Sequence, residues 1–144
     1  MSRIYSVSRA NAALPAGDDF LTITAPATHA LKIHEISAGG MGTASSANEI
    51  NVARSTGGTT PVAVTPTPLD PNDTAAAFTA ASSWATPPTL GAVVLRLPVN
   101  ANGGVYRWVA KPGCEIVIPP SGQLSIRGAG STSVVNAMAL VEEI

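Results

Sequence analysis

Short runs in which apolar and polar residues alternate recur along most of this chain, and no helical stripe of apolar residues accompanies them. Leu21 and Ile23 alternate with threonines, and Leu124 and Ile126 alternate with polar residues in the same way. Similar runs are IYSVS, LKIHEIS, EINVARS, VVLRL, VYRWV, CEIVI and SVVNAMALVEE. Glycine, proline and asparagine separate the runs, which predicts roughly eight to ten strands in an all-β antiparallel sandwich or barrel.

The segments between these runs predict where the chain turns. The Asn-Gly pair within Asn100–Gly104 predicts a hairpin between two apolar strands. Adjacent prolines in Ile118–Gly122 predict a corner, because proline has no N–H to donate to a ladder. The closing run has apolar residues at both odd and even positions from Val134 to Val141, so we expect that strand to be covered on both faces.

Two segments fit this pattern poorly, although the whole chain, 1–144, is interpreted as one domain. Residues 56–89 are rich in proline, alanine and threonine and lack a sustained period, which predicts a long loop or arm. Residues 1–16 are interpreted as an N-terminal arm. Both have few large apolar residues, so we expect them to contact other subunits, by strand addition in the case of IYSVS. The alternative for the long segment is a loop folded back over its own sandwich.

The charge content excludes several classes of partner. The 144 residues include 8 basic and 9 acidic ones, a net charge of −1, which predicts neither a nucleic-acid footprint nor a membrane patch. No apolar signal segment is recognised, so we expect synthesis in the cytoplasm. Charged residues are 12% of the chain, against about 25% on average. A surface of small neutral residues favours packing against other copies or a larger assembly, the alternative being a monomer with a Thr/Ser-rich surface.

The residues that usually carry chemistry are few and scattered. His29 and His34 are an odd number of positions apart on one expected strand, so they should lie on opposite faces and share no metal. Asp70 and Asp73 could approach a calcium ion, although an Asx turn beside Pro71 is the simpler interpretation. Lone Cys114 is expected to be a small buried hydrophobe. We therefore predict no enzyme activity and no catalytic, cofactor or metal site.

The aromatic residues leave two arrangements open. Tyr106 and Trp108 share one face of VYRWV, and Arg107 lies on the other between two valines. If the valines face the core, the aromatics form an exposed patch with Trp84, suited to stacking on sugars or to a subunit contact. If the aromatics face the core, Arg107 is an outward charge flanked by valines, which is typical of a subunit contact.

Three segments combine a strand, an acidic proline turn, a Pro-Pro-Ser-Gly corner and a terminal Glu-Glu. They are DFLTITAPATHALKIHEISAG (19–39), VTPTPLDPNDTAAAFTA (64–80) and the ending VIPPSGQLSIRGAGSTSVVNAMALVEEI. Together they resemble the small head decoration, or cement, proteins of tailed bacteriophages. The resemblance covers most of the chain from Asp19 onward and includes no catalytic signature. The segment GVYRWV departs from it, because family members often carry a further Trp-rich stretch.

The resemblance implies a β-sandwich of jelly-roll type and a structural role in the virion. Such a protein sits on the capsid exterior, commonly as a homotrimer, and bridges units of the major capsid protein. The competing hypothesis is a receptor- or carbohydrate-binding module of a phage tail or cell surface. Under either hypothesis the candidate interface residues are the bulky side chains of the two arms and of VYRWV. They are Ile4, Tyr5, Leu69, Phe78, Trp84, Tyr106 and Trp108.

Overall fold

The computed structural model describes residues 2–15, 17–129 and 133–144 as an all-β protein with two antiparallel sheets. Sheet A has the order β10-β3-β12-β1-β6, with β9 also pairing with β3, and sheet B has the order β5-β7-β2-β11-β4-β8. The strands of sheet A are β1 (Arg3–Ala13), β3 (Leu31–Met41), β6 (Thr67–Pro68), β9 (Asn102–Val109), β10 (Ile116–Ile118) and β12 (Val134–Glu143). Those of sheet B are β2 (Leu21–Thr24), β4 (Ala47–Thr56), β5 (Thr59–Val64), β7 (Thr79–Thr86), β8 (Thr89–Asn100) and β11 (Gln123–Gly128).

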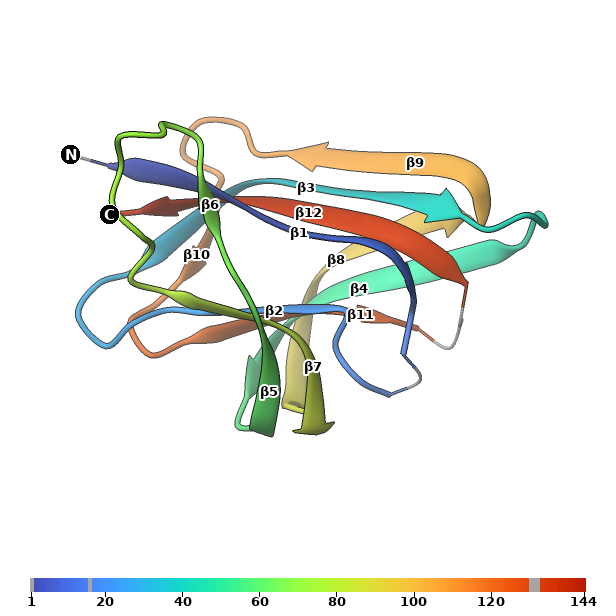
Figure 1. Ribbon diagram of the computed structural model, residues 1–144, viewed down its shortest axis with the longest axis horizontal. Helices are drawn as coiled ribbons and strands as arrows, with labels where there is room; N and C mark the ends of the chain where they lie inside the picture. The colour runs from blue at the N-terminus through green and yellow to red at the C-terminus, as the bar shows by residue number, and fades with distance from the viewer. Residues whose placement is uncertain (1, 16, 130–132) are drawn as a thin grey trace.

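The two sheets lie face to face as the layers of a sandwich, with sheet A above sheet B in Figure 1. Their inward-facing residues form one hydrophobic cluster, because strand side chains alternate between faces and the apolar parity of each strand points inward. Ile23 on β2 and Val141 on β12 are fully buried members of it. The expected all-β sandwich is therefore confirmed, and no helix occurs in the described ranges.

The connection from β8 to β9 corrects the predicted hairpin. The turn at Asn100–Gly104 is present, but β8 pairs with β4 in sheet B and β9 pairs with β3 in sheet A. The chain therefore changes sheets here. The backbone at Asn100 approaches Gly40 closely here, since a Cβ added to Gly40 would lie 2.0 Å from the carbonyl oxygen of Asn100. The predicted proline corner is confirmed: it joins the end of β10 in sheet A to the start of β11 in sheet B.

The expected N-terminal arm is wrong for the residues that form β1. This strand pairs with β12 from Arg3 opposite Glu143 to Ala13 opposite Val134, with one irregularity. Tyr5 and Val7 are completely buried in the core, so burial within the same chain offsets the entropy of ordering this segment. Residues 1 and 16, the ends of that predicted arm, lie outside the described residues.

The long segment 56–89 folds back on its own sandwich, which was the alternative interpretation. It contains β5, β6 and β7, so the described chain has more strands than expected. β7 pairs with β2 and β6 pairs with β1, while β5 pairs with β7 at the edge of sheet B. In Figure 1 the ends of β5 and β7 extend below the body of the sandwich. The segment is thus largely an intramolecular layer.

Candidate interaction surface

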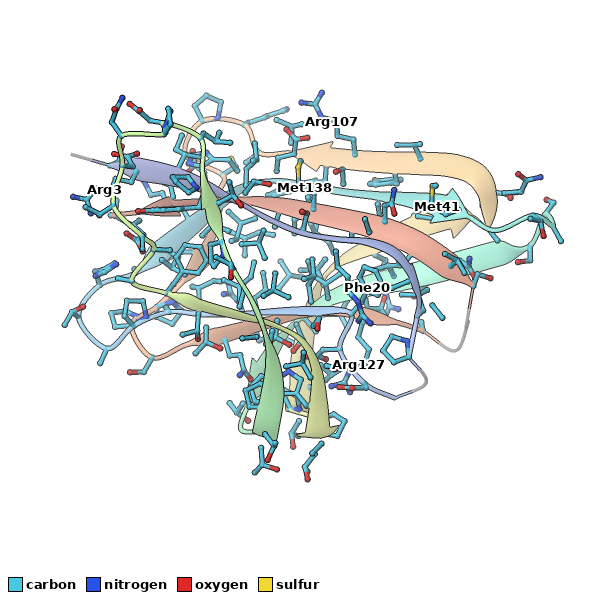
Figure 2. All side chains as sticks on the ribbon, in the orientation of Figure 1. Arg3, Phe20, Met41, Arg107, Arg127 and Met138 are labelled. Atoms are coloured by element: carbon cyan, nitrogen blue, oxygen red, sulfur yellow. The ribbon has the colours of Figure 1, made fainter. Side chains whose placement is uncertain are left out.

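The outer face of sheet A is an accessible surface built from four neighbouring strands. Cross-strand partners share a face of the sheet, and on each strand the residues that face outward alternate with residues that point into the core. We call the accessible outward residues the open face: Ser6, Ser8 and Ala10 on β1, Ser37 and Gly39 on β3, Val105, Arg107 and Val109 on β9, and Asn136, Met138 and Leu140 on β12. None of them is buried. In Figure 2 Arg107 and Met138 point away from the sandwich.

The closing strand β12 therefore has two unlike faces, which corrects the expectation of cover on both. Val135, Ala137, Ala139 and Val141 are buried in the core. The opposite parity, which includes Met138 and Leu140, is only half-buried. Its apolar residues lie on the open face and remain in contact with solvent in the single chain.

A hollow of about 340 Å³ lies in the open face where β1, β12, β3 and β9 meet. Ser8, Ala10, Ser37 and Gly39 line it with small side chains. Larger residues that line it include Asn136, Met138 and Val105, and Val105 is 77% exposed. The hollow is therefore a consequence of small residues at consecutive outward positions, flanked by larger ones.

The charged groups beside the open face are paired within the chain. Arg107 donates from Nε and Nη2 to the two carboxylate oxygens of Glu35, at 2.6 and 2.8 Å. The hydrogen bond from Arg107 lowers the pKa of Glu35, and Glu35 in turn raises the pKa of Arg107. His34 Nε2 lies 2.6 Å from a carboxylate oxygen of Glu142. Burial opposes ionisation of Glu142, but its hydrogen bonds with His34 and Ser2 leave its pKa lowered. The open face consequently presents little net charge.

The centre of the outer face of sheet B is polar but buried, the reverse of the usual pattern. Thr22 on β2 and Ser125 on β11 are fully buried, and both donate to the same carboxylate oxygen of Asp19 at 2.5 Å. Arg127 donates from Nε to the other oxygen at 2.7 Å. Figure 2 shows Arg127 on the side of sheet B away from Phe20. This polar cluster (Asp19, Thr22, Ser125 and Arg127) satisfies a fully buried carboxylate with three donors.

Residues of the folded-back segment cover the polar cluster. The Trp84 indole donates from Nε1 to Thr22 Oγ1 at 2.9 Å, and Arg127 donates to the Pro88 carbonyl at 2.8 Å. The turn between β4 and β5 packs on the same ring, since a Cβ added to Gly58 would lie 2.7 Å from it. The β7–β8 corner and the β4–β5 turn therefore form a third layer over this part of sheet B.

Two of the predicted interface residues are core residues. The rings of Tyr5 and Phe78 meet edge to face with centroids 5.5 Å apart, and they are 0% and 3% exposed. The Tyr5 hydroxyl donates to the Thr74 carbonyl at 3.1 Å. The prediction of an intermolecular role is wrong for both residues, because their side chains are already buried within the chain.

Ile4 and Leu69 are predicted interface residues that lie on the surface. They are 37% and 56% exposed, and the Leu69 amide donates to the Ile4 carbonyl at 2.9 Å. They are thus adjacent although they come from different ends of the chain. The contacts that they make with other molecules stay a prediction.

The predicted aromatic residues lie in two separate places. Tyr106 and Trp108 lie opposite the buried residues Ala38 and Ile36, so this parity of β9 faces inward. Trp108 packs against the core and Tyr106 is 36% exposed. Of the two arrangements left open, the structure has the one in which Arg107 faces outward between Val105 and Val109. Trp84 lies on β7 in the other sheet, so the three aromatics do not form one patch.

The remaining candidate residues are also placed. Cys114 is exposed, so its predicted burial is wrong. His29 precedes β3, with Nδ1 3.1 Å from Thr28 Oγ1, and it shares no site with His34. Asp70 accepts from the Asn72 amide at 2.9 Å, which is the Asx turn. Within residues 2–15, 17–129 and 133–144, no group of three or more His, Cys, Asp or Glu is arranged to hold a metal ion.

The sequence did not predict the polar cluster, and it predicted only the β9 part of the open face, as the arrangement in which Arg107 lies outward between Val105 and Val109. The rest of the open face is marked in the sequence mainly by outward Ser, Ala and Gly, which are common on any strand. Thr22, Ser125 and Arg127 occupy the polar parity of LTIT and LSIR, a pattern typical of a solvated face. One sequence signal could have indicated the burial of these residues. The proline-rich segment contains Trp84, a large side chain that needs a surface on which to pack.

Comparison with protein-family models, curated proteins and solved structures found no match to this chain. In the part of the chain that the structure describes, no helix has the length and apolar character needed to cross a membrane. The function must therefore be argued from the surface itself.

Proposed function

We propose that this chain is a structural virion protein that decorates the head of a tailed bacteriophage. In this role it binds the capsid exterior as a homo-oligomer, a trimer by the family resemblance, and bridges units of the major capsid protein. The role is one of binding and includes no catalytic step, cofactor or metal. The observation that carries it is the open face of sheet A, an accessible surface of small and apolar residues on and beside which the charged groups are already paired.

A jelly-roll topology is part of the proposal and is supported by the nesting of strand pairs. A jelly roll results when a long antiparallel hairpin is rolled up, so that its first strand pairs with its last. In this chain β4 pairs with β8, β3 with β9 and β10, β2 with β11, and β1 with β12. The folded-back segment with β5, β6 and β7 is then an insertion at the tip of the rolled hairpin.

The physical basis of decoration is mass action. A protein that binds the assembled shell and not its dissociated subunits stabilises the shell by the free energy of binding. Symmetric copies engage neighbouring sites together, so weak contacts add through avidity. Small, neutral, apolar surfaces are sufficient for this function, because no single residue has to be a strong anchor.

The alternative, a carbohydrate-binding module, has less support from the geometry. A stacking platform needs exposed aromatic faces close to one another. Trp84 packs on Gly58 and donates to Thr22, and Trp108 packs against the core on the other sheet. Tyr106 alone is too little surface to favour the alternative.

Analysis of virions tests the proposal directly. Particles of the phage whose genome encodes this chain should contain it in a fixed copy number relative to the major capsid protein, measured by mass spectrometry. Shells stripped of the protein should rebind it and become more resistant to heat. Virions that lack the protein, or stripped shells that neither bind it nor change in stability, would contradict the proposal. Binding to a glycan array that is lost in Tyr106→Ala would favour the alternative.

A further inference from the structure

We propose that the open face of sheet A is covered by a second copy of this chain. The inference rests on the proposed function only in taking the chain to self-associate, and it names the surface that does so. The open face combines large apolar residues with small ones. Met138 and Leu140 are successive outward residues of β12, and Met138 lies opposite both Ser8 and Ser37, while Val105 on β9 lies opposite Gly39. Exposed apolar side chains gathered on one face, with small residues between them, are typical of interaction sites.

The extent of the open face is sufficient for a subunit contact. Adjacent strands are about 4.8 Å apart and rise about 3.3 Å per residue, so four strands of about ten residues cover roughly 600 Å². Two copies would bury roughly 1,200 Å² in total, the lower limit for stable protein interfaces. The strands concerned have 11, 11, 8 and 10 residues.

The charge of the open face favours another copy over a charged partner. Glu35 is bound by Arg107 and Glu142 by His34, so burying this surface leaves neither carboxylate without a partner. Nucleic acid or an anionic membrane would meet no excess of positive charge here. A second copy presents an equally neutral surface, and apolar contacts of this type are characteristic of permanent homo-oligomers.

The shape of the face supplies complementary parts for that contact. The hollow is lined by small residues, and Val105 at its margin is 77% exposed. Packed surfaces interdigitate when a side chain that protrudes from one copy enters a hollow in the next. Face-to-face packing would give a dimer, and packing of the face against another side of a neighbour would give a ring such as a trimer.

Charge insertion tests the inference with a matched control. Val105→Arg places a charge on the open face, whereas Val62→Arg places one on β5 in sheet B, where the valine is 56% exposed. Both valines are exposed, so both variants should fold, as circular dichroism and thermal melting will verify. Sedimentation equilibrium should give a dissociation constant at least about 100-fold higher for Val105→Arg than for the wild type, and a change below about 3-fold for Val62→Arg.

Thiol labelling provides a second readout that does not depend on the charge. In a Cys114→Ser background, maleimide labelling of Ser8→Cys should slow at least about 10-fold on association, and labelling of Val62→Cys should not. A wild-type chain that is monomeric both at hundreds of micromolar and on the shell would overturn the inference. So would an oligomer that is indifferent to Val105→Arg and leaves Ser8→Cys reactive. Virion attachment is scored separately: an oligomer absent from virions refutes the proposed function alone, and a monomer present on them refutes this inference alone.

Discussion

The outer face of sheet A and the centre of the outer face of sheet B differ in whether the chain itself covers them. Sheet B carries Thr22, Ser125 and Arg127 outward, and these polar side chains are covered by residues of the same chain. Sheet A carries serine, glycine, alanine, valine and methionine outward, together with Arg107, and they are accessible. Antiparallel sheets commonly bury the apolar face and solvate the polar one. The central polar residues of sheet B are thus covered within the chain, and the accessibility of sheet A supports the proposal that its partner is another molecule.

The largest expected effect comes from removing the centre of the polar cluster. Asp19→Ala should lower the free energy of unfolding by about 3–5 kcal/mol, because Arg127 would be left buried without its counter-charge. The exposed fractions of the two side chains are 14% for Arg127 and 0% for Asp19. Urea denaturation measures the change. Glu49→Ala breaks a much more exposed ion pair with Arg96 and should cost less than about 1 kcal/mol. Equal losses in the two variants would contradict the internal role of the cluster.

The cover over sheet B can be tested at its tightest contact. Gly58 has φ +94°, and a Cβ there would lie 2.7 Å from the Trp84 ring, so Gly58→Ala should cost about 2 kcal/mol. Gly57 also has a positive φ, +77°, but has no atom within 4 Å of an added Cβ. Gly57→Ala should therefore cost only about 1 kcal/mol, for backbone strain. If the two variants unfold at the same urea concentration, the packing of Trp84 under this turn is not needed for stability.

Shortening a side chain of the open face should have a smaller effect on the isolated chain. Met138 is half-buried, so Met138→Ala should change the free energy of unfolding by less than about 1 kcal/mol in dilute solution. The same substitution should cost more at protein concentrations where the chain associates, because association then contributes to stability. A loss that does not vary with protein concentration would indicate that Met138 acts only within its own chain.

The smallest effect is the pH dependence of the pair beside the open face. The pKa of Glu35 is lowered by Arg107, so the folded state binds its proton less readily than the unfolded state does. Its stabilising contribution should be complete above about pH 4.3, the ordinary pKa of glutamate, and should disappear as the pH falls through the lowered value. The urea midpoint of the wild type should then fall more steeply between pH 6 and pH 3 than that of Glu35→Gln. Parallel curves for the two proteins would refute this contribution.

Local patterns predicted the strands of this protein well and their partners poorly. Alternation in LTIT and LSIR identified β2 and β11, because the period-two burial is a property of each strand alone. The Asn-Gly turn could not distinguish a hairpin from a change of sheet, since the decisive approach of Asn100 to Gly40 joins distant parts of the chain. The prediction of an arm is wrong for Tyr5, whose ring packs on Phe78, a residue remote in sequence.

The same reasoning explains what could be predicted of the candidate surface. Alternation within β9 predicted that Tyr106 and Trp108 share one face and that Arg107 lies on the other between valines, but it left open which face is inward. The hollow did not follow from alternation, because it depends on small residues from four strands coming together. Neither did the polar cluster, in which Asp19 and Ser125 are 106 positions apart. Sites assembled across a sheet become visible only when the strand order is known.

A structure of the assembled protein, on virions or as the isolated oligomer, tests the central claim most directly. Cryo-electron microscopy at a resolution that separates strands would show which molecule lies on each outer face. The account predicts density from a neighbouring copy over β1, β12, β3 and β9, with Val105 inside the contact, and only the chain's own Trp84 and Pro88 over the polar cluster. An assembly that leaves Val105 and Met138 in solvent while copies meet through sheet B would contradict it.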